Sequence, residues 1–355
     1  LTEAGLFSGQ AGDLEEVPDL DENVTRSRTV RVDFDQLGRR AEPLPEFLTL
    51  NLFPDAVLTA VCERVTRNTS GTRSWVGHLD GIDHSSVYLV IGDELLVGNV
   101  LARDTYYGVR HLEGCLHVVS EMDRSVLPLY ANETPTPVAS HSAPRLTAGT
   151  ATDDGSIIDI MIVYTTAARQ AEGGTTAIRA LIDLAVTETN AGYVNSNVTQ
   201  RLRLVHTAEV DYSASGRDSN DVMDHLRKTS DGQLDGIHAL RDLYRADLVT
   251  LLVESFADAT GGQGYLMDSL FPLFEAWAFS AVRQNYAAGY YALGHLTGYN
   301  MGCYRDRANA DHPGAFSYSY GYQAPDKAFR TIMATDCPGY CPPINHWSNP
   351  NISYG

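Results

Sequence analysis

Apolar and polar residues alternate in short runs through the first third of the chain. The runs are bounded by turn-forming residues such as Gly, Asp and Asn, and they recur about every 8–12 residues. Such alternation predicts strands with one buried face, and this recurrence is typical of an antiparallel β sandwich or barrel. The predicted strands cover residues 29–34, 56–64, 74–79, 85–91, 95–100, 106–111 and 115–120.

The pattern changes twice after residue 127. Residues 128–155 are rich in Pro, Ser and Thr and poor in apolar side chains, which predicts an exposed linker. Continuous apolar runs follow at 157–164 and 247–254, as expected for strands buried on both faces. Helical spacing alternates with the strands, which predicts an α/β arrangement. The predicted helices cover residues 167–193, 221–226, 237–243 and 291–303, and two further strands cover 202–210 and 278–283.

These patterns together predict an α+β protein of two domains. Its 355 residues fit a typical size of about 100–200 residues per domain. We expect an acidic extended arm at residues 1–28 and an all-β sandwich or barrel at 29–127. The linker at 128–155 then leads to an α/β domain at 156–355.

The chain is strongly acidic, since 26 Lys and Arg against 45 Asp and Glu give a net charge of −19. No basic stripe is present that would neutralise phosphates, so a nucleic-acid partner is not expected. Seven acidic residues and no basic residue occupy positions 1–22, a composition typical of a solvated tail unless another surface holds it. One hypothesis is that this arm pairs with the sheet edge of a second copy and builds a homo-oligomer or filament.

The cellular location is predicted from the absence of a membrane span and of a signal peptide in this sequence. The longest apolar runs are far shorter than the roughly 18 residues that cross a bilayer, so no membrane span is expected. The chain begins at Leu1 without the basic and apolar regions of a signal peptide. We therefore expect a secreted, extracellular protein whose signal peptide has already been removed.

Five cysteines leave several pairings open. Cys62 and Cys115 lie in strand-like runs and could pair across a sheet. Cys337 and Cys341 flank a Pro-Gly-Tyr loop, so they could close on each other, or one of them could reach Cys303. An odd number leaves one thiol over or pairs it between chains. Buried free thiols are the alternative for any of the five.

The segment at 294–307, GHLTGYNMGCYRDR, resembles the zinc-binding helix H-E-x-x-H-x-x-G-x-x-H of metal-dependent proteases. The chain is similar to secreted metzincin zinc endopeptidases of the adamalysin (reprolysin)-like group, above all to bacterial peptidyl-Asp metalloendopeptidase precursors. This resemblance implies a propeptide-like β domain, matched at 51–123, and a metzincin-like protease domain at 156–355. Similar segments occur in the family's order at 157–165, 246–252, 262–267, 278–283, 330–334 and 347–350.

The departures from the family pattern fall where its chemistry would be. Aligned on the motif, His295 holds the first zinc-ligand position, Leu296 the position of the catalytic Glu, Tyr299 the second ligand position and Arg305 the third. Leucine cannot accept a proton, and an arginine places a fixed positive charge where a cation would bind. Met333 matches the methionine below the metal. Two cysteine positions of the family are replaced as well, by Gly261 and Tyr286.

We therefore predict a chain that is not an enzyme and needs no cofactor. The expected function is that of a secreted pseudoprotease with a structural, assembly or binding role, which keeps its propeptide-like domain. In this interpretation His295 is a leftover core histidine and Met333 packs in the core.

Two alternatives stay open. The first is an active zinc metalloendopeptidase with an atypical site, whose ligands would come from His295 and Tyr299 with Asp306 or His312. The second is a decoy that binds protease substrates or inhibitors.

Two further segments have several interpretations. The aromatic run at 316–322 is interpreted as packing over the cleft, with a sugar-stacking or assembly surface as alternatives. The glycine-rich run at 261–264 is interpreted as a turn at an edge strand.

Overall fold

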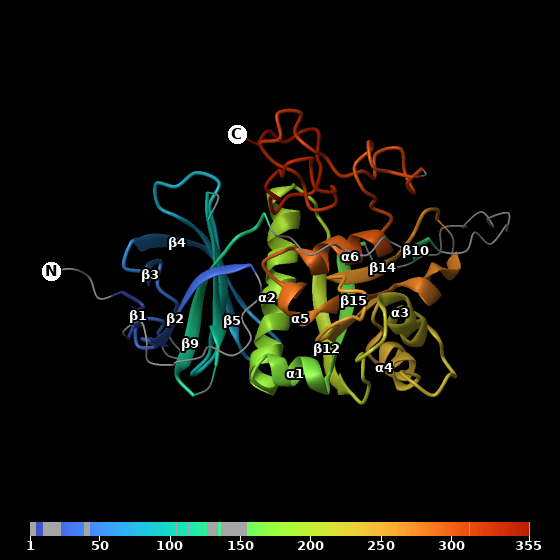
Figure 1. Ribbon diagram of the computed structural model, residues 1–355, viewed down its shortest axis with the longest axis horizontal. Coiled ribbons are helices and arrows are strands. Elements are labelled where there is room, and N and C mark those ends of the chain that lie inside the picture. The colour runs from blue at the N-terminus through green and yellow to red at the C-terminus, as the bar shows by residue number, and fades with distance from the viewer. Residues whose placement is uncertain are drawn as a thin grey trace. The chain divides into compact units, whose positions relative to one another are not determined.

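The computed structural model describes residues 5–9, 23–38, 43–103, 105–112, 114–125, 134–135, 155–270, 272–311 and 313–354. The chain divides into two compact units (Figure 1). The first unit combines Leu1–Leu127 with Arg169–Thr187, and the second combines Pro128–Ala168 with Glu188–Tyr354. Most of the predicted linker lies outside the described residues. The grouping of Arg169–Thr187 with the first unit is not predicted by the sequence.

A nine-stranded antiparallel sheet forms the first unit, in the order β1-β2-β9-β8-β7-β6-β5-β4-β3. Each predicted strand is present with shifts of a few residues at its ends, because alternating apolar positions fix which face of a strand is buried. The strands are β1 (Phe7–Ser8), β2 (Val24–Val32), β3 (Phe47–Phe53), β4 (Ala56–Arg67), β5 (Arg73–Leu79), β6 (Ser86–Ile91), β7 (Leu96–Ala102), β8 (Thr105–His111) and β9 (Leu116–Met122).

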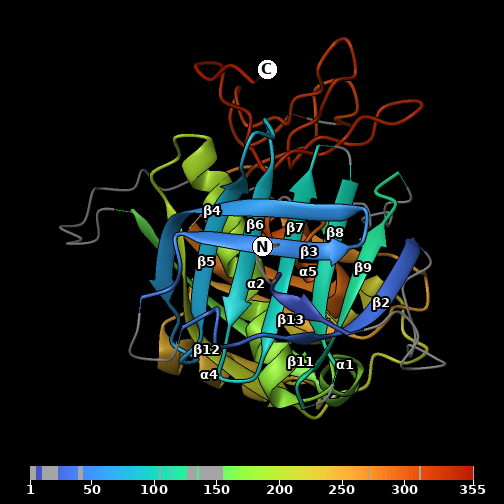
Figure 2. The ribbon, with the colours of Figure 1, turned by 90° about the vertical axis from the view of Figure 1, so that its left-hand side faces the viewer.

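The sheet curls until its two edges nearly meet. Strand β1 pairs with β2, and beside it the Leu6 backbone N–H donates to the Thr49 carbonyl oxygen of β3 at 2.9 Å. The Asn51 side chain also accepts from the Phe7 N–H at 2.8 Å. Figure 2 shows β3 and β4 crossing over β6, β7 and β8, and their apolar side chains meet in one core. The predicted all-β sandwich or barrel is confirmed.

The described part of the N-terminal arm belongs to this same sheet. Phe7 and Ser8 pair with Val32 and Arg31 of β2, and Leu6 is fully buried in the core of the unit. Residues 10–22, which carry most of the arm's acids, lie outside the described residues. Among the described residues, the arm is therefore held by its own chain, and its role in self-association stays a prediction.

The second unit contains a six-stranded sheet in the order β10-β14-β15-β13-β11-β12. Strand β14 runs antiparallel to β15, and the other pairs are parallel. All six residues of β13 are buried, as its continuous apolar run predicts. The strands are β10 (Thr134–Pro135), β11 (Ile157–Thr165), β12 (Arg201–Val210), β13 (Leu248–Val253), β14 (Gly262–Leu266) and β15 (Phe279–Arg283).

Glycines with left-handed backbone angles limit the helices. Gly173 and Gly174, at φ of 82° and 124°, divide the single helix predicted at 167–193 into α1 and α2. Gly302, at φ of 82°, follows the end of α6, which stops at Asn300. The helices are α1 (Thr166–Ala171), α2 (Thr175–Asn195), α3 (Ser219–Arg227), α4 (Gly236–Tyr244), the 3₁₀ helix η1 (Pro272–Trp277), α5 (Gln284–Ala287) and α6 (Ala292–Asn300).

The cysteine pairing is resolved within the described residues. Cys337 and Cys341 form a disulfide, which closes the predicted Pro-Gly-Tyr loop. Cys62, Cys115 and Cys303 are free thiols, so the predicted pair across the sheet is wrong. Cys62 lies on β4 and Cys115 comes just before β9, and these strands are not neighbours in the sheet. No helix in the described part of the chain is long and apolar enough to cross a membrane.

Candidate functional site

Helix α6 carries the residues that match the protease motif. All nine of its residues are buried. It lies against β14 and β15 (Figure 1). The Asn300 side-chain amide donates to the carbonyl oxygens of Tyr265 and Phe279 at 2.8 and 3.1 Å. A helix that is buried on every side needs apolar or fully hydrogen-bonded side chains all round. The sequence ALGHLTGYN meets this requirement only if its polar groups find partners within the protein.

His295 finds such partners on both ring nitrogens. Its Nδ1 lies 2.7 Å from the Ile332 carbonyl oxygen, and its Nε2 lies 2.9 Å from the Tyr299 hydroxyl oxygen. A carbonyl only accepts, so Nδ1 carries the proton and Nε2 accepts from the tyrosine. The imidazole is thus held in one neutral tautomer between the turn at 331–334 and the next turn of its own helix.

Burial is the main cause of the low basicity of His295. Desolvation lowers its pKa to about 4, although the hydrogen bond to Ile332 acts in the opposite direction. The positive charges of Arg330 and Arg305 lower it further. The ring is therefore neutral at physiological pH.

Leu296 fills the position that the resemblance assigns to the catalytic glutamate. The side chain is fully buried and packs on β14, where a Cβ at Gly262 would lie 2.6 Å from the Leu296 Cδ1 atom. A Cβ at Gly264 would lie 3.0 Å from the Leu296 carbonyl oxygen. The glycine-rich run is thus a strand and not the predicted turn, and it lacks side chains where helix α6 approaches most closely.

The turn at 331–334 supports the other side of α6. A Cβ at Gly298 would lie 2.5 Å from the Met333 Sδ atom and 2.9 Å from the Trp347 ring. Met333 is 3% exposed, so it packs against the helix directly below the histidine turn. Glycine at 298 is the residue that lets this methionine and the indole approach the helix backbone.

Arg305 and Asp306 follow the helix after Gly302. Arg305 is half-buried, and its charge acts on His295. The Asp306 carboxylate is buried and accepts from the Thr335 N–H and hydroxyl at 3.1 and 2.7 Å, and from the Asn309 amide at 2.9 Å. Asp306 therefore fastens the segment after α6 to the segment after Met333. His312, the remaining candidate ligand, lies outside the described residues.

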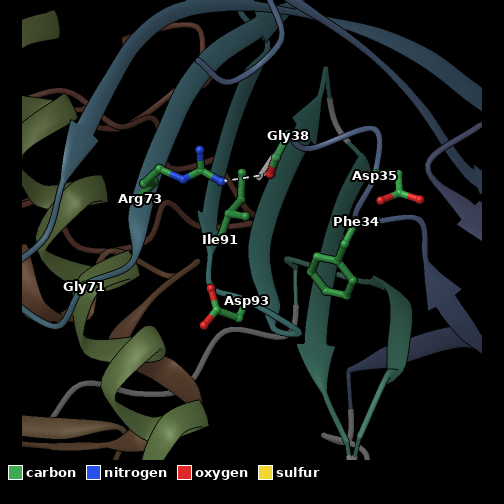
Figure 3. A pocket seen from close by; sticks show the side chains of 8 residues that line it. Phe34, Asp35, Gly38, Gly71, Arg73, Ile91 and Asp93 are labelled. Carbon is green, nitrogen blue, oxygen red and sulfur yellow. Dashed lines mark hydrogen bonds between the residues drawn. The ribbon is translucent and has the colours of Figure 1, made fainter. Parts of the chain in front are cut away.

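A small cavity of about 240 Å³ lies elsewhere, in the first unit (Figure 3). Arg73 is 7% exposed and donates to the Gly38 carbonyl oxygen at 3.2 Å. Phe34 and Ile91 form apolar walls, and Asp35 and Asp93 supply carboxylates. Charged side chains of both signs line this cavity, and none of its lining residues belongs to a motif identified from the sequence.

The fold combines a mixed sheet and its edge strand with a buried helix that carries a histidine above a turn that contains a methionine. This combination defines a protein of the metalloprotease class. A family model described as metallo-peptidase family M12B, reprolysin-like, matches residues 155–352. The chain belongs to this family.

Curated relatives extend the match over both units. The chain is 30% identical over 330 residues to a peptidyl-Asp metalloendopeptidase of Xanthomonas campestris, covering 88% of this chain and 76% of the relative. It is 31% identical over 344 residues to a protein of the same name from Stenotrophomonas maltophilia, covering 91% and 76%. Metalloproteinase-II from Bacteroides fragilis has a similar fold, with a TM-score of 0.51 at 10% identity over 86% of this chain and 88% of that one.

These relatives contradict two of the sequence predictions. The prediction that the chain is not an enzyme is wrong, because relatives about 30% identical over most of its length are metalloendopeptidases. The prediction that it needs no cofactor is wrong for the same reason, since the family is one of metallopeptidases. Both predictions relied on three positions in and just after one helix and gave too little weight to the rest of the chain.

The metal that the family implies does not find its ligands around His295. The Nε2 atom, which would face a metal, accepts the Tyr299 proton, and Asp306 is engaged by Thr335 and Asn309. No group of three His, Cys, Asp or Glu side chains that suits a metal occurs within the described ranges. We therefore derive no chemical step through zinc at this place.

Sequence reasoning missed two features of this region. The hydrogen bond between His295 and Tyr299 follows from their spacing of four residues, which places both on one helix face. The close approach of α6 to β14 has a weaker signal, namely glycines at alternate positions of a strand.

Proposed function

We propose that the chain is an extracellular protein of the metalloendopeptidase family that binds polypeptides in extended form along β14. One observation carries the proposal. Thr134 and Pro135 form β10 and pair in parallel with Tyr265 and Leu266 of β14. The outer edge of β14 thus takes up an extended segment of its own chain, and an added peptide can use the same backbone hydrogen bonds.

The lengths of β10 and β14 indicate that the edge of β14 can pair with a longer segment than β10. Strand β10 has two residues and β14 has five, so within the described residues the pairing covers only part of β14. The relatives act, by their names, at peptidyl-Asp bonds. We therefore expect peptides that contain aspartate to be the first ligands to test. Binding is favoured over assembly because the described part of the N-terminal arm already pairs with its own sheet.

The test is a titration with labelled decapeptides that contain one central Asp, monitored by fluorescence anisotropy. The matched control is the same peptide with N-methylated backbone amides, which cannot pair with a strand edge. We expect saturable binding of the first peptide and at least about tenfold weaker binding of the second. Equal binding of both peptides, or none of the unmodified one, contradicts the proposal.

The same samples show whether the bound peptide is cleaved. Zinc content is measured by mass spectrometry on protein purified without chelator, and peptide products are separated by chromatography. Cleavage with near-stoichiometric metal places the ligands outside the residues around His295. Binding without cleavage separates peptide recognition from hydrolysis in this chain. Both results are compatible with recognition along β14, which the N-methylated control tests by itself.

A further inference from the structure

A second, larger cleft lies in the loops that come after α6 in the chain. It has a volume of about 1060 Å³ and lies entirely within the second unit. Its lining comes from the segments 306–308, 318–331 and 344–354, and none of its residues belongs to β14 or α6. The cleft is therefore a site separate from the proposed peptide edge, and an inference about it does not depend on binding there.

Three tyrosines of the aromatic run line this cleft. Tyr318, Tyr320 and Tyr322 occupy alternate positions, and all three line the cavity. Tyr318 lies in a turn that is closed by the hydrogen bond from the Ser319 N–H to the Phe316 carbonyl oxygen at 3.2 Å. Tyr318 is 75% exposed and Tyr322 is 46% exposed, so two of these side chains are open to a ligand. The aromatic run that the sequence singles out thus faces a cavity.

Further aromatic residues line the cleft. The Phe329 ring lies 6.0 Å from Tyr322 and 4.8 Å from Tyr354, and the His346 ring lies 5.1 Å from Tyr354. Trp347 and two prolines, Pro325 and Pro350, complete the lining. An array of Tyr, Trp, Phe and Pro around an open cleft buries apolar surface while leaving phenol hydroxyls as hydrogen-bond donors.

Polar contacts hold two of these tyrosines, Tyr320 and Tyr322, in place. The Tyr320 hydroxyl accepts from the Gly314 N–H at 2.8 Å, and the Arg307 guanidinium lies 4.2 Å above the Tyr320 ring. The Tyr322 N–H donates to the Thr331 hydroxyl at 2.9 Å, and the Tyr322 carbonyl accepts from the Thr331 N–H at 2.9 Å. A site whose rings are already ordered loses little entropy when a ligand binds.

Charge indicates a neutral ligand. The charged lining residues are Asp306, Arg307 and Asp326. Asp306 is engaged by Thr335 and Asn309, Arg307 lies over Tyr320, and Asp326 accepts from the Ala328 N–H at 3.1 Å. Because these charges are of both signs and already have partners within the protein, the cleft favours neither an anionic nor a cationic ligand.

We propose that this cleft binds proline-rich polypeptide in the polyproline II conformation. Such a segment is neutral, rigid and extended, and its rings stack on aromatic side chains. It makes no internal hydrogen bonds, so its carbonyl oxygens are available to the tyrosine hydroxyls. A helix or a globular partner does not offer repeating apolar rings together with free carbonyls in this way.

The test is a titration of the full-length protein with a labelled eleven-residue peptide that contains two P-x-x-P repeats. A Gly/Ser peptide of equal length and a neutral hexasaccharide are titrated in parallel. We expect saturable binding of the proline-rich peptide only. Binding of the hexasaccharide without the peptide overturns the proposal in favour of a sugar site, and binding of neither overturns it outright.

Variants tie the binding to the cleft. Tyr318→Ala and Tyr322→Ala should each weaken binding about tenfold or more, since a stacked aromatic ring is the usual anchor of such grooves. Tyr318→Phe keeps the stacking face and should lose less. Tyr244→Ala is the matched control, because Tyr244 is a 37% exposed tyrosine on α4, outside the cleft. Unchanged affinity in both cleft alanine variants, with circular dichroism matching the wild type, overturns the proposal.

Discussion

At the scale of single residues, the pair formed by His295 and Tyr299 decides what helix α6 can do. Both side chains are almost fully buried, and the phenol donates to the nitrogen that a metal would require. The pair satisfies two polar groups inside an otherwise apolar helix environment. The pair therefore contributes a buried hydrogen bond to the stability of the fold, and a buried polar group without such a bond would lower that stability.

Tyr299→Phe tests this contribution directly. The change keeps the ring and removes the hydroxyl that donates to His295 Nε2, so we expect a loss of about 1–3 kcal/mol in the free energy of unfolding. Urea denaturation monitored by tryptophan fluorescence measures it. Tyr244→Phe, at an exposed position, should change stability by less than about 0.5 kcal/mol. Equal effects of the two variants would show that the buried hydroxyl contributes nothing.

A second buried histidine predicts how stability depends on pH. His117 is fully buried, its Nε2 accepts from the Leu96 N–H at 3.0 Å, and its Nδ1 lies 3.1 Å from the Cys115 carbonyl oxygen. Burial lowers its pKa from 6.5 to about 4. The unfolded chain therefore takes up a proton near pH 6.5 while the folded chain stays neutral, and stability present above pH 6.5 is lost as the pH falls toward 4.

The expected loss is about 3 kcal/mol across this window, from the difference between the two pKa values. His117→Gln cannot titrate, so the pH dependence of its unfolding free energy should be smaller by that amount. Urea melts of both proteins at pH 7, 5.5 and 4 measure the difference. His78→Gln, at a half-buried histidine on β5, serves as the control. Parallel pH profiles for wild type and His117→Gln would contradict the prediction.

At the scale of elements, the sequence predicts strands better than their contacts. Alternation and continuous apolar runs are enough to predict β4 to β9, β11 and β13, because the period of two is imposed by the pleat itself. Strands β1 and β10 have two residues each, too few to show a period. The approach of α6 to β14 depends on atoms distant in sequence, and no local pattern determines it.

That approach makes a sharp prediction about glycine. Gly264→Ala places a Cβ 3.0 Å from the Leu296 carbonyl oxygen, so the helix must move, and we expect a loss of about 1–3 kcal/mol. Gly236→Ala is the control, since a Cβ there meets nothing within 4 Å and alanine is the better helix former. The control should be neutral or slightly more stable in thermal denaturation. Similar melting temperatures for both variants would contradict the close contact.

The pairing of β10 with β14 predicts competition with added peptide. Exchanging Thr134 and Pro135 for glycine raises the entropic cost of holding β10 extended by about 0.5–1 kcal/mol per position. The anisotropy titration should then show several-fold tighter binding of the aspartate peptide. The same exchange at Pro144 and Thr147 is the control within the same Pro/Ser/Thr-rich segment. Unchanged affinity in the first variant would mean that β10 does not compete for the peptide site.

At the scale of the whole molecule, the sequence predicts the two kinds of structure but not how helix α2 is shared. Hydrophobic periodicity separates an alternating first part from an α/β second part. It carries no information on which unit a buried helix joins. Residues Arg169–Thr187 belong with the β sheet of the first unit although they come after the linker. The family was likewise predictable from matched segments, whereas activity was misjudged from a few positions in and just after one helix.

Polar contacts explain why this part of α2 belongs to the first unit. The Asp183 carboxylate accepts from the Thr72 hydroxyl at 2.7 Å and from the Ser70 hydroxyl, and Thr187 shares a 2.7 Å hydrogen bond with Ser74. Burial raises the pKa of Asp183, and the two hydroxyl donors oppose that shift. A buried carboxyl with these partners is costly to separate from them.

Cutting the chain within residues 136–150 should therefore not release the β domain. The fragment after the cut still carries Arg169–Thr187, which completes the first unit, so we expect both fragments to elute together near the 38.8 kDa of the intact chain. Asp183→Ala removes the acceptor of two hydroxyl groups and should loosen the complex about tenfold or more. Asp242→Ala, on the separate helix α4, should leave it intact. Independent elution of the fragments from the cut wild-type protein would mean that the nine-stranded sheet is held by the linker alone.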